Sequence, residues 1–525
     1  MSQPRDDRQD DLFGPSLETI INLRHPLVRL ATEIDWGFLA GRFGSVCRVG
    51  PGQPPLPTRL VAGLLILKHM HDLSDEALCD RWVENPYFQY FCGEVVFQHA
   101  APFDRSSLTR WRQRLGEEQI AALLQESLSV AHRTKAIETR DLERVVVDTT
   151  VQEKAIAHPT DARLIHRAIE KLVALAKREG IELRQSYLRV AKRAAIMMGR
   201  YTHAHQFKRA RRELKFLRTR LGRIIRDIRR KIEHDPARQE CFGPLLDLAM
   251  RVRLQEQRQR GPKVYSLHAP EVECIGKGKA RAPYEFGCKV SIVTPVTAPK
   301  GGQFVLHAKA LHGNPYDGHT LGPVIADLEK LTGVAVHRIH GDKGYRGHTY
   351  PGRFKVWISG QVRRVTKAIR RQMRRRAAVE PVIGHLKDDH RMRRNYLKGR
   401  DGDRINAVLA AAGYRGAFAR PAMDHLSRTF PDAIGVVGDQ KHSSQPTLDE
   451  IVSTRCAWQS QWSSGRLRAV FAGMTASVMT YRYISARSPR KRRTLSRVWL
   501  ASPPAAWMVI PRVYSLNRPN ICLRS

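Results

Sequence analysis

The segment RRQMRRRAAVEPVIGHLKDDHRMRR carries one glutamate, Glu380, in strongly basic surroundings. Residues 361–400 contain 14 Lys or Arg against three acids, so a positive field surrounds this carboxylate and attracts phosphate. Helical spacing places Arg376, Glu380 and Lys387 on one stripe of one helix. A carboxylate flanked by cations on one face suits metal-assisted phosphoryl transfer. The alternative is a solvated basic helix whose glutamate only relieves repulsion, and the rest of the chain decides between them.

Two further carboxylates lie at predicted strands. Asp148 lies in the β-branched run RVVVDTTVQ at 144–152, which predicts a buried strand with an acid at its tip. Asp342 lies where the strand VAVHRIHG enters a Gly-flanked turn. Two metal ions held ~3.5–4 Å apart need carboxylates that converge from different elements, and oxygen ligands indicate two Mg²⁺ or Mn²⁺ ions. The order of these strands and of the Glu380 helix is that of an RNase H-like fold.

The composition narrows the class of protein. The chain has 525 residues and a formal charge of +40, which indicates a nucleic-acid partner. Its eight cysteines form no CxxC pair and no zinc-finger spacing, so we expect reduced core thiols. The longest apolar stretches, such as LVAGLLIL at 60–67, are far shorter than the ~20 residues of a spanning helix, and the polar start predicts no secretory signal. We therefore expect a cytoplasmic protein.

The N-terminal part has a helical pattern. After a disordered start at 1–15, residues 16–134 are predicted to form a helical DNA-binding domain. Within it, FDRSSLTRWRQRLGEE at 103–118 resembles a recognition helix that begins at Ser106 or Ser107. Its exposed cations would be Arg105, Arg110, Arg112 and Arg114. An amphipathic helix with a basic outer face explains this segment equally well.

Residues 140–414 are predicted to form an α/β domain, so the whole chain is α+β. A strongly basic helical insertion occupies about 161–260, with apolar residues at a spacing of three or four typical of a helical hairpin. Three strands, at 264–270, 284–295 and 303–313, are predicted to pair antiparallel. The loop GKGKAR that follows the first of them lacks the spacing of a P-loop, so no ATP site is expected.

The C-terminal part changes character. Residues 451–525 contain no Asp or Glu and 13 Lys or Arg, and they show no sustained helical or strand period. We therefore predict that 415–525 is an atypical basic tail, poorly folded and produced by a frameshift.

Four stretches closely resemble the DDE transposases of short bacterial insertion sequences, in particular the family typified by insertion sequence five. They are VVVDTTVQEKAIAHPTDARL, YSLHAPEVECIGKGKARAPYEFGCKVSIVT, HGDKGYRG and RRRAAVEPVIGHLKDDHRMRRNYLKGRDGDRINAVLAAAGY. The resemblance covers roughly residues 16–414. The related signature Tyr-x2-Arg-x3-Glu-x6-Lys falls on Met373, Arg376, Glu380 and Lys387, so its tyrosine is missing.

The resemblance implies roles for the carboxylates and cations. Asp148, Asp342 and Glu380 would be the catalytic residues that bind two Mg²⁺ or Mn²⁺ ions. Arg376 and Lys387 would hold phosphates near the cut, with Lys343 as a weaker candidate.

The resemblance also implies partners. The chain would bind double-stranded DNA, both the terminal inverted repeats and the target, as a homo-oligomer near the nucleoid. A catalytically inactive or domesticated DNA-binding protein is the alternative function, and a stand-alone nuclease is a third. His340 and His385 are interpreted as structural, because a metal-activated water needs no further base.

Overall fold

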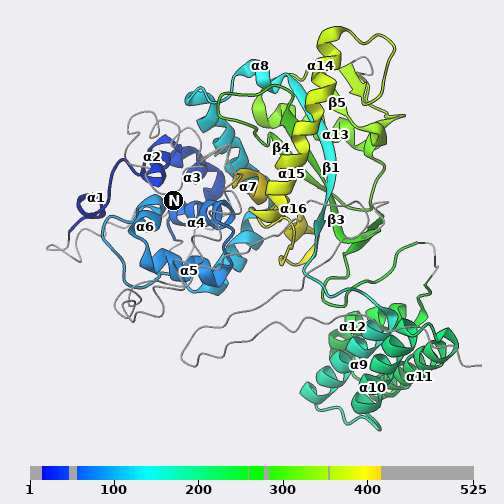
Figure 1. Cartoon of the computed structure of the whole chain (residues 1–525). Coiled ribbons are helices and arrows are strands. Elements are labelled where there is room, and N and C mark those ends of the chain that lie inside the picture. Colours follow the sequence, from blue (N-terminus) through cyan, green and yellow to red (C-terminus); the bar gives the residue numbers. More distant parts are fainter. Residues whose placement is uncertain are drawn as a thin grey trace, which may run out of the picture. The chain divides into compact units, whose positions relative to one another are not determined.

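The computed structural model of the chain describes residues 15–45, 56–257, 259, 261–276, 283–352 and 355–414 (Figure 1). The disorder expected for 1–14, the GKGKAR loop after Gly276 and the basic tail expected over 415–525 lie outside these ranges. Within them, no helix is long and apolar enough to cross a membrane.

The first part of the chain is helical. Its core is built on α4, whose sequence TRLVAGLLILKHM is almost continuously buried. Side-chain caps define several helix starts; Ser74, for example, accepts a hydrogen bond of 3.0 Å from the Ala77 amide. The helices are α1 Leu17–Ile20, α2 Pro26–Glu33, α3 Trp36–Gly44, α4 Thr58–Met70, α5 Asp75–Glu84, α6 Pro86–Cys92, α7 Arg105–Arg133 and α8 Thr139–Leu142.

Helix α7 contains the predicted recognition segment. It begins one residue earlier than expected from Ser106, because Asp104 is the cap and its side chain accepts from the Ser106 amide at 2.8 Å. The helix is broken inside this segment at Gly116, which has a φ of 68° and a ψ of −174°. Only glycine adopts such a conformation without strain, so this kink separates the basic N-terminal half of α7 from its buried C-terminal half.

A six-stranded mixed sheet forms the centre of the second part, so the predicted α+β class is confirmed. The strand order is β2-β3-β1-β5-β6, with β4 on the same edge of β3 as β2. Strand β3 is antiparallel to β1, β2 and β4, whereas β5 is parallel to β1 and β6. The strands are β1 Arg144–Glu153, β2 Glu273–Gly276, β3 Tyr284–Pro295, β4 His307–Leu311, β5 Arg338–Gly341 and β6 Val356–Ile358.

Two strand predictions are wrong in detail. The stretch 264–270 forms no strand, and the edge strand β2 lies just after it. Val264 and Leu267 instead pack into the core of the inserted helices. Strand β1 continues to Glu153 because it pairs with β3 along its whole second half, so Asp148 lies in the middle of the strand and not at its tip.

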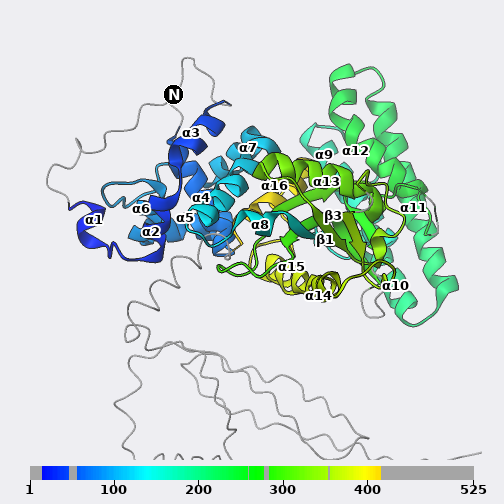
Figure 2. The same ribbon diagram turned by 90° about the horizontal axis from the view of Figure 1, so that it is seen from above.

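Helices cover both faces of the sheet, with α13 on one face and α14 and α15 on the other (Figure 2). The expected single helix around Glu380 is interrupted by a 3-10 turn, η3, which contains Arg376. Helix α16 is almost entirely buried between β4 and α7, which joins the sheet and the first helices into one core. The elements are α13 Asp317–Thr332, η1 Lys343–Tyr345, α14 Lys367–Arg375, η3 Arg376–Ala378, α15 Val379–Asp388 and α16 Gly399–Ala412.

The insertion is a bundle of four helices with a core of its own. The seam predicted from the three-to-four spacing is buried, including Leu217, Leu221, Ile225 and Ile228 of α11. Most of the arginines of α11 lie on its solvent face, because a stripe of apolar residues faces the bundle. The four helices are α9 Asp161–Arg178, α10 Leu188–His203, α11 Phe207–Lys231 and α12 Pro236–Leu254.

Candidate active site

The pleat of β1 decides which way Asp148 points. Val145 and Val147 belong to the main core, whereas Val146 packs with Val379 at the start of α15. Successive side chains of a strand point to opposite faces, so Asp148 shares the face of Val146. Asp148 therefore lies on the face of the sheet that α15 covers.

The parallel pairing of β1 with β5 brings a second carboxylate to the same face. Val146 pairs with His340. Two residues further along each strand direction, the same register places Asp148 beside Asp342. Strand β5 ends at Gly341, and the Asp342 side chain caps η1 by accepting from the Gly344 amide at 2.8 Å. The 194-residue separation of the two aspartates in the sequence is thus also the register offset of the two strands.

The pKa of Asp148 reflects the acids that lie near it. It is only 9% exposed, and burial, with the nearby charges of Asp342 and Glu380, raises its pKa to about 6. The Thr149 amide and the guanidinium of Arg376 act in the opposite direction. Arg376 Nη1 lies 3.2 Å from Asp148 Oδ2 and compensates part of the negative charge.

Glu380 completes the group from the first turn of α15, where its side chain is exposed. Asp342 and Glu380 are close enough to raise the pKa of Asp148, although the three carboxylates do not all lie within 4.8 Å of one another. The three carboxylates therefore lie near one another on the α15 face of the sheet, and the guanidinium of Arg376 contacts Asp148.

Lys387 and Lys343 occupy different surroundings. Lys387 lies 3.7 Å from Glu285 Oε2 and lines a cavity of about 490 Å³ together with Arg391 and Arg394. Lys343 is exposed on η1, next to Asp342. Met373, which stands where the related signature has tyrosine, is half-buried on α14.

One of the four arginines that were predicted to be exposed, Arg112, is buried. Arg112 is 3% exposed and makes a double ion pair with Asp75, with Nη1–Oδ1 and Nη2–Oδ2 distances of 3.0 and 2.6 Å. It holds α7 to α5 and is not available for phosphate. Arg105, Arg110 and Arg114 are exposed on the same helix. A helical wheel could not separate Arg112 from them, because Asp75 lies 37 residues away in the sequence.

The two histidines differ as well. His340 is buried on β5, and burial lowers its pKa to about 4, so it is neutral at pH 7. His385 is exposed on α15 and its Nδ1 lies 2.7 Å from Asp389 Oδ2. Neither ring makes a hydrogen bond to Asp148, Asp342 or Glu380 among the described contacts.

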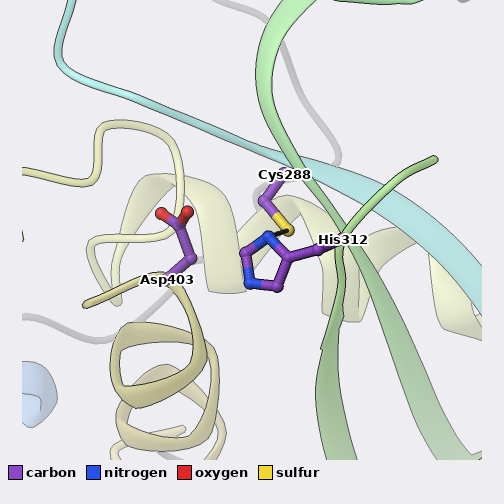
Figure 3. A group of neighbouring side chains, drawn as sticks. All are labelled: Cys288, His312 and Asp403. Atoms are coloured by element: carbon purple, nitrogen blue, oxygen red, sulfur yellow. Dashed lines mark hydrogen bonds between the residues drawn. The ribbon is translucent and has the colours of Figure 1, made fainter. Parts of the chain in front are cut away.

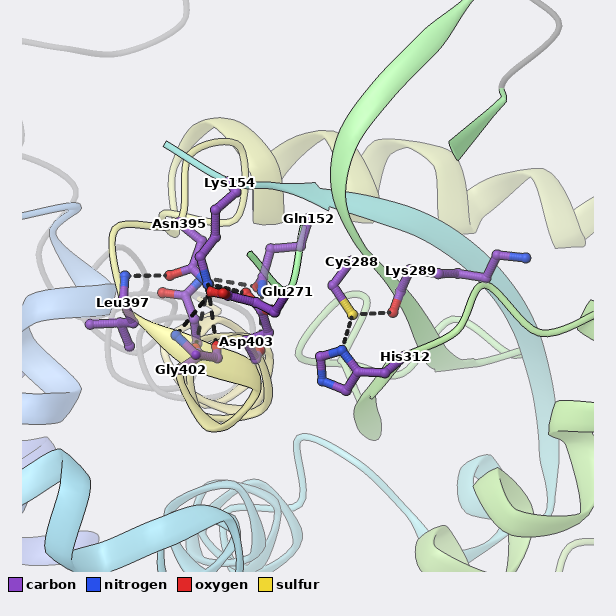
Figure 4. Close-up of polar contacts among 12 residues, drawn as sticks. Gln152, Lys154, Glu271, Cys288, Lys289, His312, Asn395, Leu397, Gly402 and Asp403 are labelled. Atoms are coloured by element: carbon purple, nitrogen blue, oxygen red, sulfur yellow. Dashed lines mark hydrogen bonds and ion pairs between the residues drawn. The ribbon is translucent and has the colours of Figure 1, made fainter. Parts of the chain in front are cut away.

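Sequence reasoning missed a buried polar network beside the sheet (Figure 4). Lys154 is almost completely buried and bonds to Asp403 and Glu271 at 2.8 and 2.9 Å. Asn395 donates to Asp403 at 2.7 Å and also joins the end of β1 through backbone bonds. Buried charges require such pairing, so the network fixes the chain after α15 against β1 and α16.

Three potential metal ligands also meet in this region: Cys288, His312 and Asp403 lie within 4.8 Å of one another (Figure 3). The Cys288 Sγ and His312 Nδ1 are 3.5 Å apart, and burial raises the pKa of the thiol. Asp403, however, is already engaged by Lys154, so a cation here would have to break a buried ion pair. We therefore assign no metal role to these residues.

Two comparisons with known proteins found similar sequences. Residues 15–114 match the family described as Transposase domain (DUF772). The chain is 54% identical over 199 residues to the uncharacterized protein ORF8 in the nfe locus of Rhizobium meliloti, which covers 38% of this chain and 96% of that protein. This chain belongs to a transposase family. No solved structure matches it.

The match assigns the transposase domain to the helical part of this transposase-family chain, from before α1 into the first half of α7. Arg105, Arg110 and Arg114 lie inside the matched range or at its end, whereas Asp148, Asp342 and Glu380 lie outside it.

Proposed function

We propose that this chain is a DDE transposase of the insertion-sequence-five type, with an RNase H-like catalytic domain. It would bind the terminal inverted repeats of a DNA element, cut the DNA and transfer the strand to a target. The observation that carries the proposal is the convergence of Asp148, Asp342 and Glu380, from two adjacent parallel strands and one helix, on a single face of the sheet.

The carboxylates fit a divalent cation site. Burial next to two other acids raises the pKa of Asp148 to about 6, a cost that a bound cation would relieve. All three side chains offer oxygen ligands, which suit Mg²⁺ or Mn²⁺. Bound at Asp148, Asp342 and Glu380, two such ions would supply a nucleophilic hydroxide and neutralise charge on the phosphate.

The chain's own residues would position the DNA for two successive reactions. In the first, water attacks the scissile phosphorus, the P–O3′ bond breaks and a 3′-hydroxyl is released. In the second, that hydroxyl attacks a target phosphodiester, joining the strands and releasing a target 3′-hydroxyl. Arg376 would exchange its contact with Asp148 for a phosphate oxygen, while Lys387 and Lys343 hold the flanking strand.

The helical part would select the element ends. Arg105, Arg110 and Arg114 project from the start of α7, and the buried pair of Arg112 with Asp75 keeps that helix in place. The charge of +40 adds strong, salt-sensitive attraction to any DNA. Such a protein would work in the cytoplasm at the nucleoid, as a homo-oligomer on paired ends.

Cleavage of the DNA that flanks the gene tests the proposal. Purified full-length protein is incubated with a duplex that carries the terminal inverted repeats, with Mg²⁺, Mn²⁺ or EDTA. We expect nicks at the repeat ends only with a divalent ion. Asp148→Asn, Asp342→Asn and Glu380→Gln should each abolish the nicks and keep repeat binding.

Asp401→Asn is the matched control, because Asp401 is an exposed carboxylate at the start of α16, paired with Arg404. It should cut like the unaltered protein. Specific binding without cleavage by the unaltered protein would support the inactive or domesticated alternative. Unchanged cleavage in any of the three carboxylate variants would overturn the site.

A further inference from the structure

Tyr396 is an exposed aromatic residue on a firmly anchored segment. Its side chain is 61% exposed, although Met392 and Asn395 just before it are fully buried. Tyrosine buries a large apolar surface when it packs into a core, so exposing the ring forgoes that stabilisation. Packing in the core therefore does not explain why a tyrosine stands at this position.

The residues before and after Tyr396 in the sequence are held by hydrogen bonds. The Asn395 amide donates to Glu153 O at 2.7 Å, and the Ala155 amide donates to Asn395 O at 2.8 Å. The Leu397 amide donates to the Asn395 side chain at 2.9 Å. These bonds fix the backbone to the end of β1, so the segment that carries the ring has little backbone entropy to lose when a ligand stacks on it.

Two guanidinium groups flank the ring. The Arg391 and Arg394 Cζ atoms lie 5.9 and 5.5 Å from its centroid. Arg391 is held in turn by the Asp72 carbonyl, to which its Nη1 donates at 2.9 Å. Tyr396 also lines the cavity of about 490 Å³ that Lys387 borders. The cavity is lined by five basic and three acidic side chains, so its balance is positive.

This cavity lies beside the candidate active site. Lys387 is seven residues beyond Glu380 on α15, which corresponds to about 10 Å along the helix axis. An aromatic ring between arginines, at that distance from a phosphoryl-transfer site, has the chemistry that binds an unstacked nucleobase with its phosphates. Tyr284 provides the contrast, because it is equally exposed at 61% and no arginine–ring contact is recorded for it among the described residues.

We propose that Tyr396 is a stacking platform for an unpaired base of the DNA strand that enters the active site. Arg394 and Lys387 would hold the phosphates next to that base, and Arg391 supports the ring. The inference rests on the proposed function, since it names the form of DNA that this site takes. The strand that is cut would then have one base out of the stack of the repeat duplex when it lies in the site.

Binding to single strands with and without bases tests the platform apart from catalysis. The full-length protein is titrated in EDTA with a fluorescent oligothymidine strand and with the same strand carrying abasic sites. The unaltered protein should bind the thymidine strand roughly tenfold more tightly. Tyr396→Ala should remove most of this preference and Tyr396→Phe should keep it, whereas Arg394→Ala should weaken both strands equally.

Other aromatic residues of a long basic chain also contact bases, so a second measurement locates the contact. The strand is substituted with 5-iodouracil, irradiated with the protein, and the crosslinked peptides are identified by mass spectrometry. A crosslink at Tyr396 that persists in Tyr284→Ala is expected. The absence of this crosslink, an unchanged thymidine preference in Tyr396→Ala, or no binding to either strand would each overturn the platform. None of these results would overturn the proposed function, which depends on cleavage of the repeat duplex.

Discussion

At the scale of single residues, Asp148 is the most constrained side chain of the candidate site. It is buried in the middle of a strand, faces two other acids and has one guanidinium contact. Burial next to two acids destabilises the ionised form of this carboxylate, and a raised pKa with specific charged neighbours is typical of functional sites. The buried, ionised Asp148 thus destabilises the fold locally, as is expected of a residue kept for function.

That cost should be measurable as a pH dependence of stability. The pKa of Asp148 is about 6 in the folded chain against 3.8 without structure, so the folded state binds the proton more tightly. Its contribution to stability is therefore present below pH 3.8 and is lost as the pH rises through about 6. A shift of about two pKa units corresponds to ~3 kcal/mol.

We expect Asp148→Asn to remove this loss. In EDTA, the melting temperature of the variant should rise relative to the unaltered protein between pH 4 and 7, as followed by circular dichroism. Asp401→Asn should behave like the unaltered protein. Adding Mg²⁺ at pH 7 should stabilise the unaltered protein more than Asp148→Asn; parallel melting curves for the two proteins at every pH would contradict the assignment of the charge to Asp148.

A second prediction concerns Arg112. It separates residues of α7 that stabilise the fold from residues that bind DNA. Removing one partner of its buried pair with Asp75 leaves a buried charge, so Arg112→Ala should lower the free energy of unfolding by ~3–5 kcal/mol. Arg110→Ala, on the exposed side of the same helix, should change stability by less than ~0.5 kcal/mol. Urea denaturation measures both values. A DNA gel shift should show weaker binding for Arg110→Ala, and an unaffected stability in Arg112→Ala would refute the structural role.

These residues also show what sequence reasoning can reach. Asp148, Asp342 and Glu380 stand out because an acid at a strand or in a basic helix is unusual locally, and the structure brings them to one face. Burial of Arg112 and the Lys154 network depends on partners far along the chain. Local pattern contains no information about such partners, so charge and periodicity could not identify them.

At the scale of elements, strands and helices with strong internal patterns were predicted closely. The predicted strand 284–295 coincides with β3. Segment 264–270 alternates like a strand but packs on the helical bundle, because tertiary contacts override weak β-propensity. The 3-10 turn at Arg376 has no marker in an otherwise continuous helical sequence.

Gly287 makes the pairing of β1 with β3 testable. A Cβ atom there would lie 1.9 Å from the Gln152 carbonyl oxygen, which is a backbone atom and cannot move aside without shifting β1. Gly287→Ala should therefore lower the free energy of unfolding by ~1–3 kcal/mol or more. Gly276→Ala is the control, because its Cβ would meet no atom within 4 Å. Equal urea midpoints for the two variants would show that the strands are not paired this closely.

At the scale of the whole molecule, the order of the elements could be predicted from the sequence, but their packing could not. The sequence separates a helical part, an inserted helical block and strands. It does not indicate that α16, at the end of the described chain, lies between β4 and α7 and closes one core over both parts. Such contacts join residues hundreds of positions apart, and only the folded chain defines them. The bundle α9–α12 is different, because its core is formed from neighbouring helices.

The bundle should accordingly fold without the rest of the protein. Its buried residues come almost entirely from 162–267, and low sequence separation of contacts favours autonomous, rapid folding. A fragment spanning 157–268 should show a helical circular dichroism spectrum and one cooperative thermal transition. Leu221→Ala, at a fully buried position of α11, should cost the fragment ~2–5 kcal/mol, whereas Leu254→Ala, at a position 64% exposed, should have little effect. A fragment that is unfolded, or that responds equally to both substitutions, would mean that the bundle depends on the sheet for its stability. The insertion would then be part of the domain that contains the sheet and not a separate folding unit.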